Sequence, residues 1–436
     1  MAEFKIELTD NVIINHAGIA FIAKFLNDTR IFSQINLVSR FKKNSGFISD
    51  YDVVKTVITL ITLGKTSFDD VEMYRGDKYF KKVLNLKTVP SAVTIRQRLE
   101  TYDINLWRVL RRINVESVYD YFEDETIEIN GKRYIVVDSD VTPMDNSDTK
   151  KEGVSKTYKL FNGYAPMMSY AGRSGFMINN ELRPGDHHSN CEGTLEYFKQ
   201  TINMTKQLGS YPLLSILDSG NDDSKLVVQF KSQGSEFIIK RNLRKESKEK
   251  YIEYAMEYAK IHGTKEKQYE GCIKYYSNWS REIENEPIPI VVVVTEKTIT
   301  KGQPMLIPEY EVEVYWNSLD LKAKEVEELY HKHGTMEQYH SEFKSDLDLE
   351  RLPSGKFSSN YTIMLLGMIS FNLLRIAGKV LLETKKVPGK RGNRLRLRTV
   401  IQNIMYMAGQ YIAHARRNIL KIFKGYKWTT AFTMIM

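Results

Sequence analysis

Three acidic residues, Asp140, Asp218 and Glu337, have positions that suit metal-dependent chemistry. Asp140 ends the apolar run RYIVVDSD, Asp218 ends PLLSILD, and Glu337 lies in a charged segment expected to be helical. Carboxylates at the ends of central strands lie at the rim of a sheet, where ligands bind in α/β folds. Three carboxylates that meet there can hold two Mg²⁺ or Mn²⁺ ions about 3.5–4 Å apart, since these hard cations prefer oxygen ligands. The chemistry expected is in-line attack on a phosphodiester.

The first acid has a competitor in Asp138, two residues earlier in the same run. Side chains alternate along a strand, so Asp138 and Asp140 point to the same face and either can bind a metal. We favour Asp140. A lone aspartate at a strand end is more often a turn or capping residue, and spacing in one sequence does not show that the three acids meet.

The expected elements follow the order of an α/β protein. Residues 1 to about 125 show the apolar spacing of helices, as in residues 53–64. From Arg133 the pattern changes to three strands, in RYIVVDSD, KLFNGYAPMMSYAG and GFMINNELRPGD, followed by an amphipathic helix over residues 191–209 and the strand PLLSILDSG. Three strands, a helix and a strand predict a mixed sheet, as in an RNase H-like core.

We expect three parts in the chain. A helical N-terminal DNA-binding domain takes residues 1–127, and an RNase H-like catalytic domain takes residues 128–384, with a β-rich insertion at about 228–318. A basic helical region covers residues 385–436, including an expected helix near 400–423.

The positive charge of the protein is concentrated in its C-terminal region. Residues 385–428 contain twelve Lys or Arg and no Asp or Glu, whereas the whole chain of 436 residues has a net charge of +9. The rest of the chain is therefore slightly acidic. Such a block suits a surface that neutralises nucleic-acid phosphates, with Arg394 and Arg396 as candidate contacts; a solvated basic tail is the alternative.

Further candidates for DNA contact lie in two other segments. Arg96 follows the helix start at Pro90 and Ser91, in a pattern that fits a recognition helix but also many ordinary helices. Lys240 and Arg241 in EFIIKRNLRK can grip DNA, and protection of an edge strand by lysine is an equal alternative.

Several classes of protein are not indicated. Cys191 and Cys272 give neither a disulfide framework nor a metal-binding spacing. The N-terminus lacks the pattern of a signal peptide, and the longest apolar stretch is interrupted by polar residues, so we expect a cytoplasmic protein without membrane contact. No phosphate-binding loop of the G-x-x-x-x-G-K-[ST] kind is present, so no nucleotide cofactor is expected.

The stretch YHKHGTMEQYHSEFK, residues 330–344, resembles the Y-x2-R-x3-E-x6-K signature of one group of bacterial insertion-sequence transposases with Asp-Asp-Glu active sites. Tyr330, Glu337 and Lys344 fit the spacing, and His333 takes the place of Arg. The segments DSDVT, NGYAPM, LRPGDHHSN and LPSGKFSSN resemble the branch called the IS-thirteen-eighty-like family. The resemblance covers most of residues 50–400. It implies an RNase H-like fold, a β-rich insertion before the glutamate, and the catalytic and metal-binding acids Asp140, Asp218 and Glu337.

The signature has a physical interpretation. Glu337 and Lys344 are seven residues apart, or two helical turns, so one helix face can offer a metal ligand and a phosphate-binding ammonium. Tyr330 can stack on a base or contact a phosphate. His333 lacks the fixed fork and permanent charge of Arg, so its phosphate contact would depend on pH. An exposed helix with an ordinary mix of charges is the alternative.

These observations predict a DNA transposase of the cut-and-paste kind. It would bind the terminal inverted repeats of its element, cleave the ends with two divalent ions, and join the 3′-hydroxyls to target DNA. Two ends must be held together, so we expect a homodimer on DNA, in the bacterial cytoplasm at the nucleoid. A transposase-derived DNA-binding protein without catalysis and a host RNase H-like nuclease are the alternatives.

Overall fold

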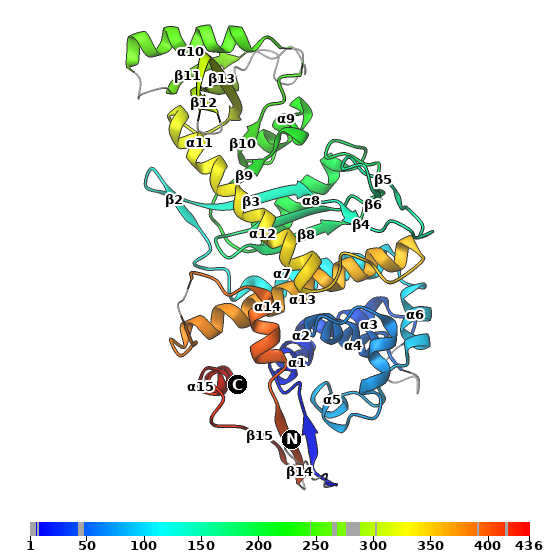
Figure 1. Ribbon diagram of the computed structural model, residues 1–436. Helices are drawn as coiled ribbons and strands as arrows, with labels where there is room; N and C mark the ends of the chain where they lie inside the picture. The colour runs from blue at the N-terminus through cyan, green and yellow to red at the C-terminus, as the bar shows by residue number, and fades with distance from the viewer. Residues whose placement is uncertain are drawn as a thin grey trace. The chain divides into compact units, whose positions relative to one another are not determined.

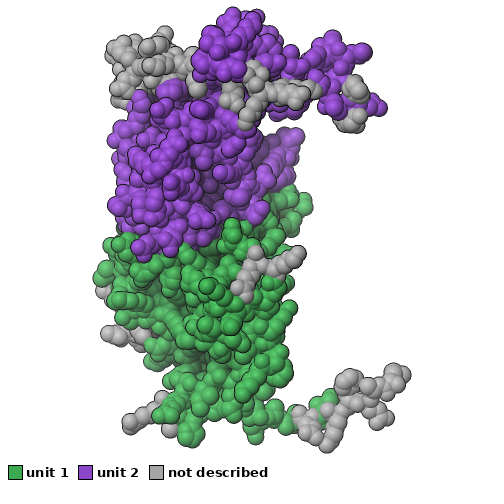
Figure 2. Space-filling model, turned by 90° about the vertical axis from the view of Figure 1, so that its left-hand side faces the viewer, with its two compact units in different colours: residues 1–121, 144–154, 341–436 green, residues 122–143, 155–340 purple. Residues whose placement is uncertain are grey.

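The computed structural model describes residues 6, 8–41, 48–244, 246–263, 268–275, 288–300, 303–389, 392–414 and 417–436. The chain forms two compact units, each built from separate stretches of sequence (Figure 2). Unit 1 comprises residues 1–121, 144–154 and 341–436, and unit 2 comprises residues 122–143 and 155–340. The N-terminal helices and the C-terminal region thus belong to one unit, which differs from the three consecutive parts expected.

Unit 1 is mainly helical. Its N-terminal elements are β1 (Val12–Ile14), α1 (Ile19–Leu26), α2 (Thr29–Phe32), α3 (Ile35–Val38), α4 (Asp50–Thr62), the 3₁₀ helix η1 (Phe68–Tyr74), α5 (Lys78–Val83), α6 (Ala92–Leu99) and α7 (Ile104–Tyr119). Its later elements are β4 (Met144–Asp145), the π-helical turn η4 (Glu342–Asp346), α13 (Phe357–Glu383), α14 (Leu397–Val400), the π-helical turn η5 (Ile401–Met405), β14 (Gly409–His414), β15 (Arg417–Ile422) and α15 (Thr429–Ile435).

The core of unit 1 forms around α13, which packs against α1, α4, α6, α7, α14 and α15. By length and composition α13 could cross a membrane, but 83% of its most apolar window is buried inside the protein. A helix that is apolar on all sides is expected at the centre of a helical core. The helix expected over residues 53–64 is present as α4, capped by the Ser49 hydroxyl, which accepts from the Asp52 amide.

The C-terminal region corrects one expectation. Instead of a helix near residues 400–423, the chain forms an antiparallel hairpin of β14 and β15, and β1 pairs with β14 (Figure 1). The apolar residues spaced by seven in this segment suggested a helix. The strands are stabilised by hydrogen bonds to β1. Because β1 comes from the opposite end of the sequence, this pairing could not be predicted from the residues of the C-terminal segment alone.

Unit 2 is built on one mixed sheet of nine strands, in the order β11-β12-β13-β10-β9-β3-β7-β8, with β2 beside β3. The strands that form its centre are β3 (Lys132–Val141), β7 (Met167–Ala171), β8 (Phe176–Glu181), β9 (Leu213–Leu217) and β10 (Glu236–Lys240). β3 pairs antiparallel with β7 and parallel with β9, and β9 pairs parallel with β10. The predicted mixed sheet is therefore present.

The insertion extends this sheet instead of forming a separate one. Its strands β11 (Gln268–Tyr275), β12 (Ile288–Thr300) and β13 (Gln303–Asn317) continue from β10 through an antiparallel β10–β13 pairing. The remaining elements of unit 2 are β2 (Ile127–Ile129), β5 (Ser155–Lys156), β6 (Asn162–Tyr164), α8 (Thr194–Lys206), the 3₁₀ helix η2 (Ser219–Asn221), α9 (Ser224–Ser232), α10 (Lys248–His262), α11 (Ala323–Lys332), the 3₁₀ helix η3 (His333–Thr335) and α12 (Met336–Ser341).

Different helices cover the two faces of the sheet. On one face, the Ser139 and Ser169 hydroxyls lie 2.6 Å apart, and Ser169 lies 2.8 Å from the Tyr197 hydroxyl of α8. On the other face, Ala323 and Val326 of α11 pack in one cluster with Ile216 of β9. Because side chains alternate along β3, the residues before and after Ser139 project toward the face that α11 covers.

Candidate active site

The pairing of β3 with β9 brings Asp140 and Asp218 to the same edge of the sheet. The parallel register ends at Ser139 opposite Leu217, so the next residue of each chain segment is an aspartate. Neighbouring strands lie about 4.8 Å apart, so the two carboxylates start from adjacent positions. Asp138 lies opposite Ile216, one pleat further inside the sheet. The register therefore pairs Asp218 with Asp140 more closely than with Asp138.

Local hydrogen bonds orient both carboxylates. The Asn221 side-chain amide donates to Oδ1 of Asp218 at 2.7 Å, and the short helix η2 holds Asn221 in this position. The backbone amide of Val141 donates to Oδ1 of Asp140 at 2.6 Å. Both aspartates are partly buried. A partly buried carboxylate held by a local donor is prepared to act as a ligand with little loss of side-chain entropy.

Two tyrosines lie within electrostatic range of both aspartates. Burial, together with the negative charges of Asp140 and Asp218, raises the pKa of Tyr158 to about 12. Burial and the charges of Asp218, Glu313 and Asp140 also raise the pKa of Tyr330 above its ordinary value. Tyr330 belongs to the signature, whereas Tyr158 lies in the β5–β6 turn and gave no sequence signal.

Glu337 lies on α12 and is exposed, while its neighbours Met336, Tyr339 and His340 are buried. The Tyr339 and His340 rings lie 5.2 and 5.5 Å from the Tyr170 ring of β7. Tyr170 is the antiparallel partner of Asp138, so it projects to the same face as Asp138 and Asp140. All three predicted acids therefore belong to unit 2, and the helices α11 and α12 cover the face toward which Asp140 projects.

A close approach at Gly175 fixes the position of α12. Gly175 has a φ of +67°, and a Cβ there would lie 2.2 Å from Cζ of Tyr339. We expect Gly175→Ala to destabilise the protein by about 2 kcal/mol or more, through backbone strain and a clash with Tyr339, and to reduce activity by shifting the helix that carries Glu337. Chemical denaturation followed by circular dichroism measures the loss.

The matched control is Gly334→Ala in η3, three residues before Glu337, where a Cβ would meet nothing within 4 Å. This variant should keep the stability of the parent protein. Equal stability of the two variants would show that the Gly175 approach does not hold α12 in place.

The other signature residues have different surroundings. The backbone of His333 begins η3, but its side chain lies outside what the structure describes. Lys344 belongs to unit 1, where its Nζ lies 3.5 Å from Oε2 of Glu350. It stands in the π-helical turn η4 instead of an α-helix. A π-helix has more residues per turn than an α-helix, so the shared-face argument from a spacing of seven does not transfer unchanged.

Lys240 and Arg241 belong to internal ion-pair networks. Lys240 is paired with Glu313 and lies 5.5 Å from the Tyr330 ring centre. Arg241 is 4% exposed, pairs with Glu246 at 2.6 Å and lies over the Trp316 ring. The burial of Arg241 is incompatible with direct DNA contact in this conformation. It corrects that expectation: Arg241 supports the junction between β10 and the insertion.

Among the described residues, the one group of three possible metal ligands that lie within 4.8 Å of one another does not include Asp140, Asp218 or Glu337. Glu313, Glu327 and His331 each place one ligand atom within 4.8 Å of the others. Lys240 already neutralises Glu313, and the Gln268 amide donates to Glu327 at 2.9 Å. Although burial opposes it, the hydrogen bond from Lys240 holds the pKa of Glu313 below its ordinary value. We interpret the group as an ion-pair network beside Tyr330.

The basic candidates of unit 1 divide into exposed and paired residues. Arg96 on α6 is exposed, and its guanidinium lies 5.4 Å from the Phe68 ring centre. Arg394 pairs with the buried Glu342, and Arg396 pairs with Asp346 at 2.8 Å. The Arg394 side chain is only 20% exposed. Its charge is therefore largely used within the fold, which is a poor fit to the DNA contact expected of it.

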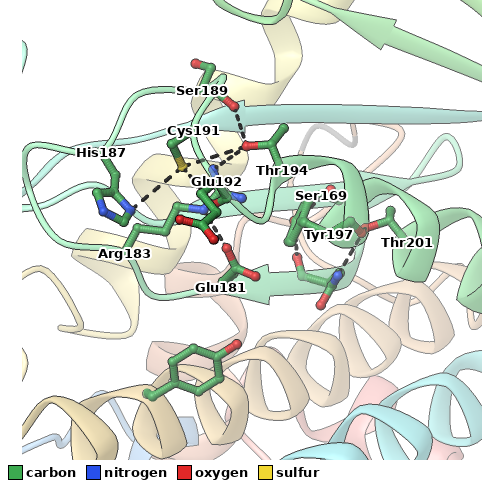
Figure 3. Close-up of polar contacts among 12 residues, drawn as sticks. Ser169, Glu181, Arg183, His187, Ser189, Cys191, Glu192, Thr194, Tyr197 and Thr201 are labelled. Atoms are coloured by element: carbon green, nitrogen blue, oxygen red, sulfur yellow. Dashed lines mark hydrogen bonds and ion pairs between the residues drawn. The ribbon is translucent and has the colours of Figure 1, made fainter. Parts of the chain in front are cut away.

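The segment between β8 and α8 forms a polar network (Figure 3). Cys191 Sγ lies 3.7 Å from Nδ1 of His187, and the Thr194 hydroxyl donates to the Ser189 carbonyl at 2.9 Å. Arg183 pairs with Glu181 at 2.6 Å. These contacts are those of a structured turn that leads into α8.

The donor set at the sheet edge fits divalent cations of the magnesium type. Asp140 and Asp218 offer carboxylate oxygens at adjacent positions, with Glu337 on the helix that covers the same face. Oxygen-only ligands suit Mg²⁺ or Mn²⁺ better than zinc. Burial is the main cause of the raised pKa values of Tyr158 and Tyr330, and the negative charges of Asp140 and Asp218 add to it.

Comparison with known proteins agrees with this chemistry. The family "Transposase DDE domain group 1" matches residues 3–436, so the chain belongs to this family of transposases. No curated protein matches the chain. Among solved structures, it is similar to the piggyBac transposase synaptic complex with hairpin DNA, at a TM-score of 0.43 and 12% identity, over 92% of this chain and 82% of that one.

Proposed function

We propose that the protein is a cut-and-paste transposase with an RNase H-like catalytic core, of the IS-thirteen-eighty-like branch. The observation that carries the proposal is the β3–β9 register, which ends with Asp140 and Asp218 side by side under α11 and α12. The strand order β8-β7-β3-β9-β10, with its antiparallel and parallel pairs, supports an RNase H-like core.

In this proposal Asp140, Asp218 and Glu337 hold two Mg²⁺ or Mn²⁺ ions. When bound, the ions activate an attacking oxygen and stabilise the leaving oxygen of the phosphodiester. Asn221 and the Val141 amide keep the two aspartates oriented for binding. Glu337, which is exposed, completes the set from the helix side.

The tyrosines contribute as neutral donors. With a pKa of about 12, the Tyr158 hydroxyl stays protonated at neutral pH. Tyr330 also stays protonated, because its pKa is raised as well. A protonated hydroxyl near two carboxylates can donate to a phosphate oxygen without adding negative charge. We propose that Tyr158 and Tyr330 orient the DNA strand at the acids, with Lys344, Lys240, Arg96 and Arg396 as further DNA contacts.

Strand cleavage tests the proposal. The substrate is a duplex that carries the terminal repeat from the DNA flanking the gene, and the control is an unrelated duplex of equal length. Nicking at the repeat in Mg²⁺ or Mn²⁺ but not in EDTA is expected, with assembly of a homodimer on the DNA. Binding without cleavage in either metal would favour a non-catalytic DNA-binding protein. Cleavage of both duplexes alike would favour a general nuclease.

His333 offers a separate prediction. If this residue takes the place of the signature Arg, His333→Arg should keep or raise strand transfer near pH 8, where an unperturbed histidine is largely neutral and Arg is charged. The rate of strand transfer as a function of pH measures the effect. Loss of activity in this variant would contradict the replacement.

A further inference from the structure

The hairpin of β14 and β15 has one face that points away from the core of unit 1. The cross-strand pairs on this face are Gln410 with Lys421, Ile412 with Ile419, and His414 with Arg417. Ile13 of β1 joins them as the partner of Gln410. We call this set the hairpin face: Ile13, Ile412, His414, Arg417, Ile419 and Lys421.

The two faces of the hairpin differ sharply in burial. On the inner face, Ile14 is 4% exposed and Tyr411 is 7% exposed, with the Tyr411 ring 5.5 Å from that of Tyr79. On the hairpin face, Ile13 is 66% and Ile419 is 42% exposed, and His414, Arg417 and Lys421 are exposed. Apolar residues scattered singly over a surface are ordinary, but neighbouring exposed isoleucines on one strand face, rimmed by polar residues, are typical of an interaction surface.

The cations of the hairpin face also form no ion pairs with the acids that the structure describes. Among the described residues, no ion pair involves Arg417 or Lys421, and Lys424 and Lys427 just beyond β15 have none either. In contrast, Arg394, Arg396 and Arg398 from the same basic region pair with Glu342 or Asp346. Among the described residues of the basic region, the hairpin and the residues that follow it therefore carry several cations that no acid of the fold pairs with.

We propose that the hairpin face docks onto duplex DNA, in particular the end of the element. This inference rests on the proposed function and names the surface that holds the substrate. Beyond the residues that pair with β1, the hairpin continues as two strands, over residues 412–414 and 417–419. A two-stranded ribbon fits the major groove, cations at its rim can contact phosphates, and aliphatic side chains can contact thymine methyl groups. A second copy of the chain fits less well, because symmetric pairing of this face would bring like charges together.

The experiment compares binding of the repeat duplex and an unrelated duplex over a range of salt concentrations, in EDTA so that no cleavage occurs. Arg417→Ala/Lys421→Ala should lower affinity by about tenfold or more and reduce the slope of log K against log salt by about two, since each lost phosphate contact removes about one released cation. Ile419→Ser should lower affinity with the slope unchanged.

The matched control is Arg108→Ala/Arg112→Ala, which removes two exposed arginines from α7 of the same unit. This control should keep both affinity and slope. An equal effect in both double variants would mean a general loss of charge and would overturn the inference. If the double alanine variant does not fold, Lys421→Gln, which changes one exposed side chain, should still reduce the slope by about one.

Two other results are distinguishable. If the parent protein binds the repeat duplex and the hairpin variants bind equally well, the inference fails and the proposed function stands. If the parent protein binds neither duplex, the proposed function fails with it. Sedimentation without DNA tests whether a second copy of the chain covers this face instead. If the parent protein is a dimer, and Ile419→Ser dissociates the dimer but leaves DNA binding unchanged, this face is a subunit interface and the inference is overturned.

Discussion

Asp218→Asn and Asp140→Asn are each expected to abolish metal-dependent strand cleavage, while Asp138→Asn retains most of it. Either of the first two removes a carboxylate that we propose as a metal ligand, where the β3 and β9 ends meet. Metal ions supply several kcal/mol of transition-state stabilisation, so cleavage should fall by at least about a thousandfold. The measurement is single-turnover nicking of the repeat duplex in Mg²⁺ and in Mn²⁺.

The three variants are matched, because each replaces one Asp by Asn on the same sheet face or its edge. Binding of the repeat duplex in EDTA should be kept in all three, which separates catalysis from folding and docking. If Asp138→Asn alone abolishes cleavage, the assignment of the first acid is wrong. If all three variants cleave at the parent rate, the acid pair is not the active site.

Glu342→Gln is expected to destabilise unit 1 strongly. The Glu342 carboxylate is 1% exposed, and it accepts from Arg375 Nη2 at 2.9 Å, from Arg394, and from the Leu397 amide at 3.2 Å. Arg375 is itself 2% exposed. Removing the negative charge leaves a buried guanidinium uncompensated, at a cost of about 3–5 kcal/mol. Urea denaturation followed by circular dichroism measures this difference.

A surface pair provides the control for Glu342. Glu311 and Lys297 lie 2.6 Å apart, but both side chains are about half exposed. Water screens such a pair, so Glu311→Gln should leave the denaturation midpoint nearly unchanged. Similar midpoints for Glu342→Gln and Glu311→Gln would show that the buried network does not hold unit 1 together.

Local patterns predicted most of the elements of unit 2. The strand that contains Asp140, the strand that ends just before Asp218, the helix between them and the strand-rich insertion are all present, because apolar periodicity is a property of neighbouring residues. The division into two units could not be predicted from local sequence patterns. Unit 1 combines segments from both ends of the chain, and no local composition records that α13 packs with the N-terminal helices.

Local sequence patterns also could not predict which of the candidate DNA-binding cations are exposed. Sequence identified Arg241, Arg394 and Arg396 as cations, but exposure depends on which acids the fold brings near. Arg241 forms an ion pair with Glu246, and Arg394 forms an ion pair with Glu342, which lies far away in the sequence. The hairpin of β14 and β15 was expected as a helix, and its exposed cations appear only when β1 pairs with it and defines an inner and an outer face.

The sequence by itself determined that acids follow apolar strand patterns and that Asp138 and Asp140 share a face, and from these and the pattern around Glu337 it predicted the kind of chemistry. These follow from side-chain type and the two-residue period of a strand. Only the tertiary structure decided that Asp140, and not Asp138, stands next to Asp218. That choice depends on the register between β3 and β9, which hydrogen bonds between distant segments fix and which strand periodicity alone leaves open.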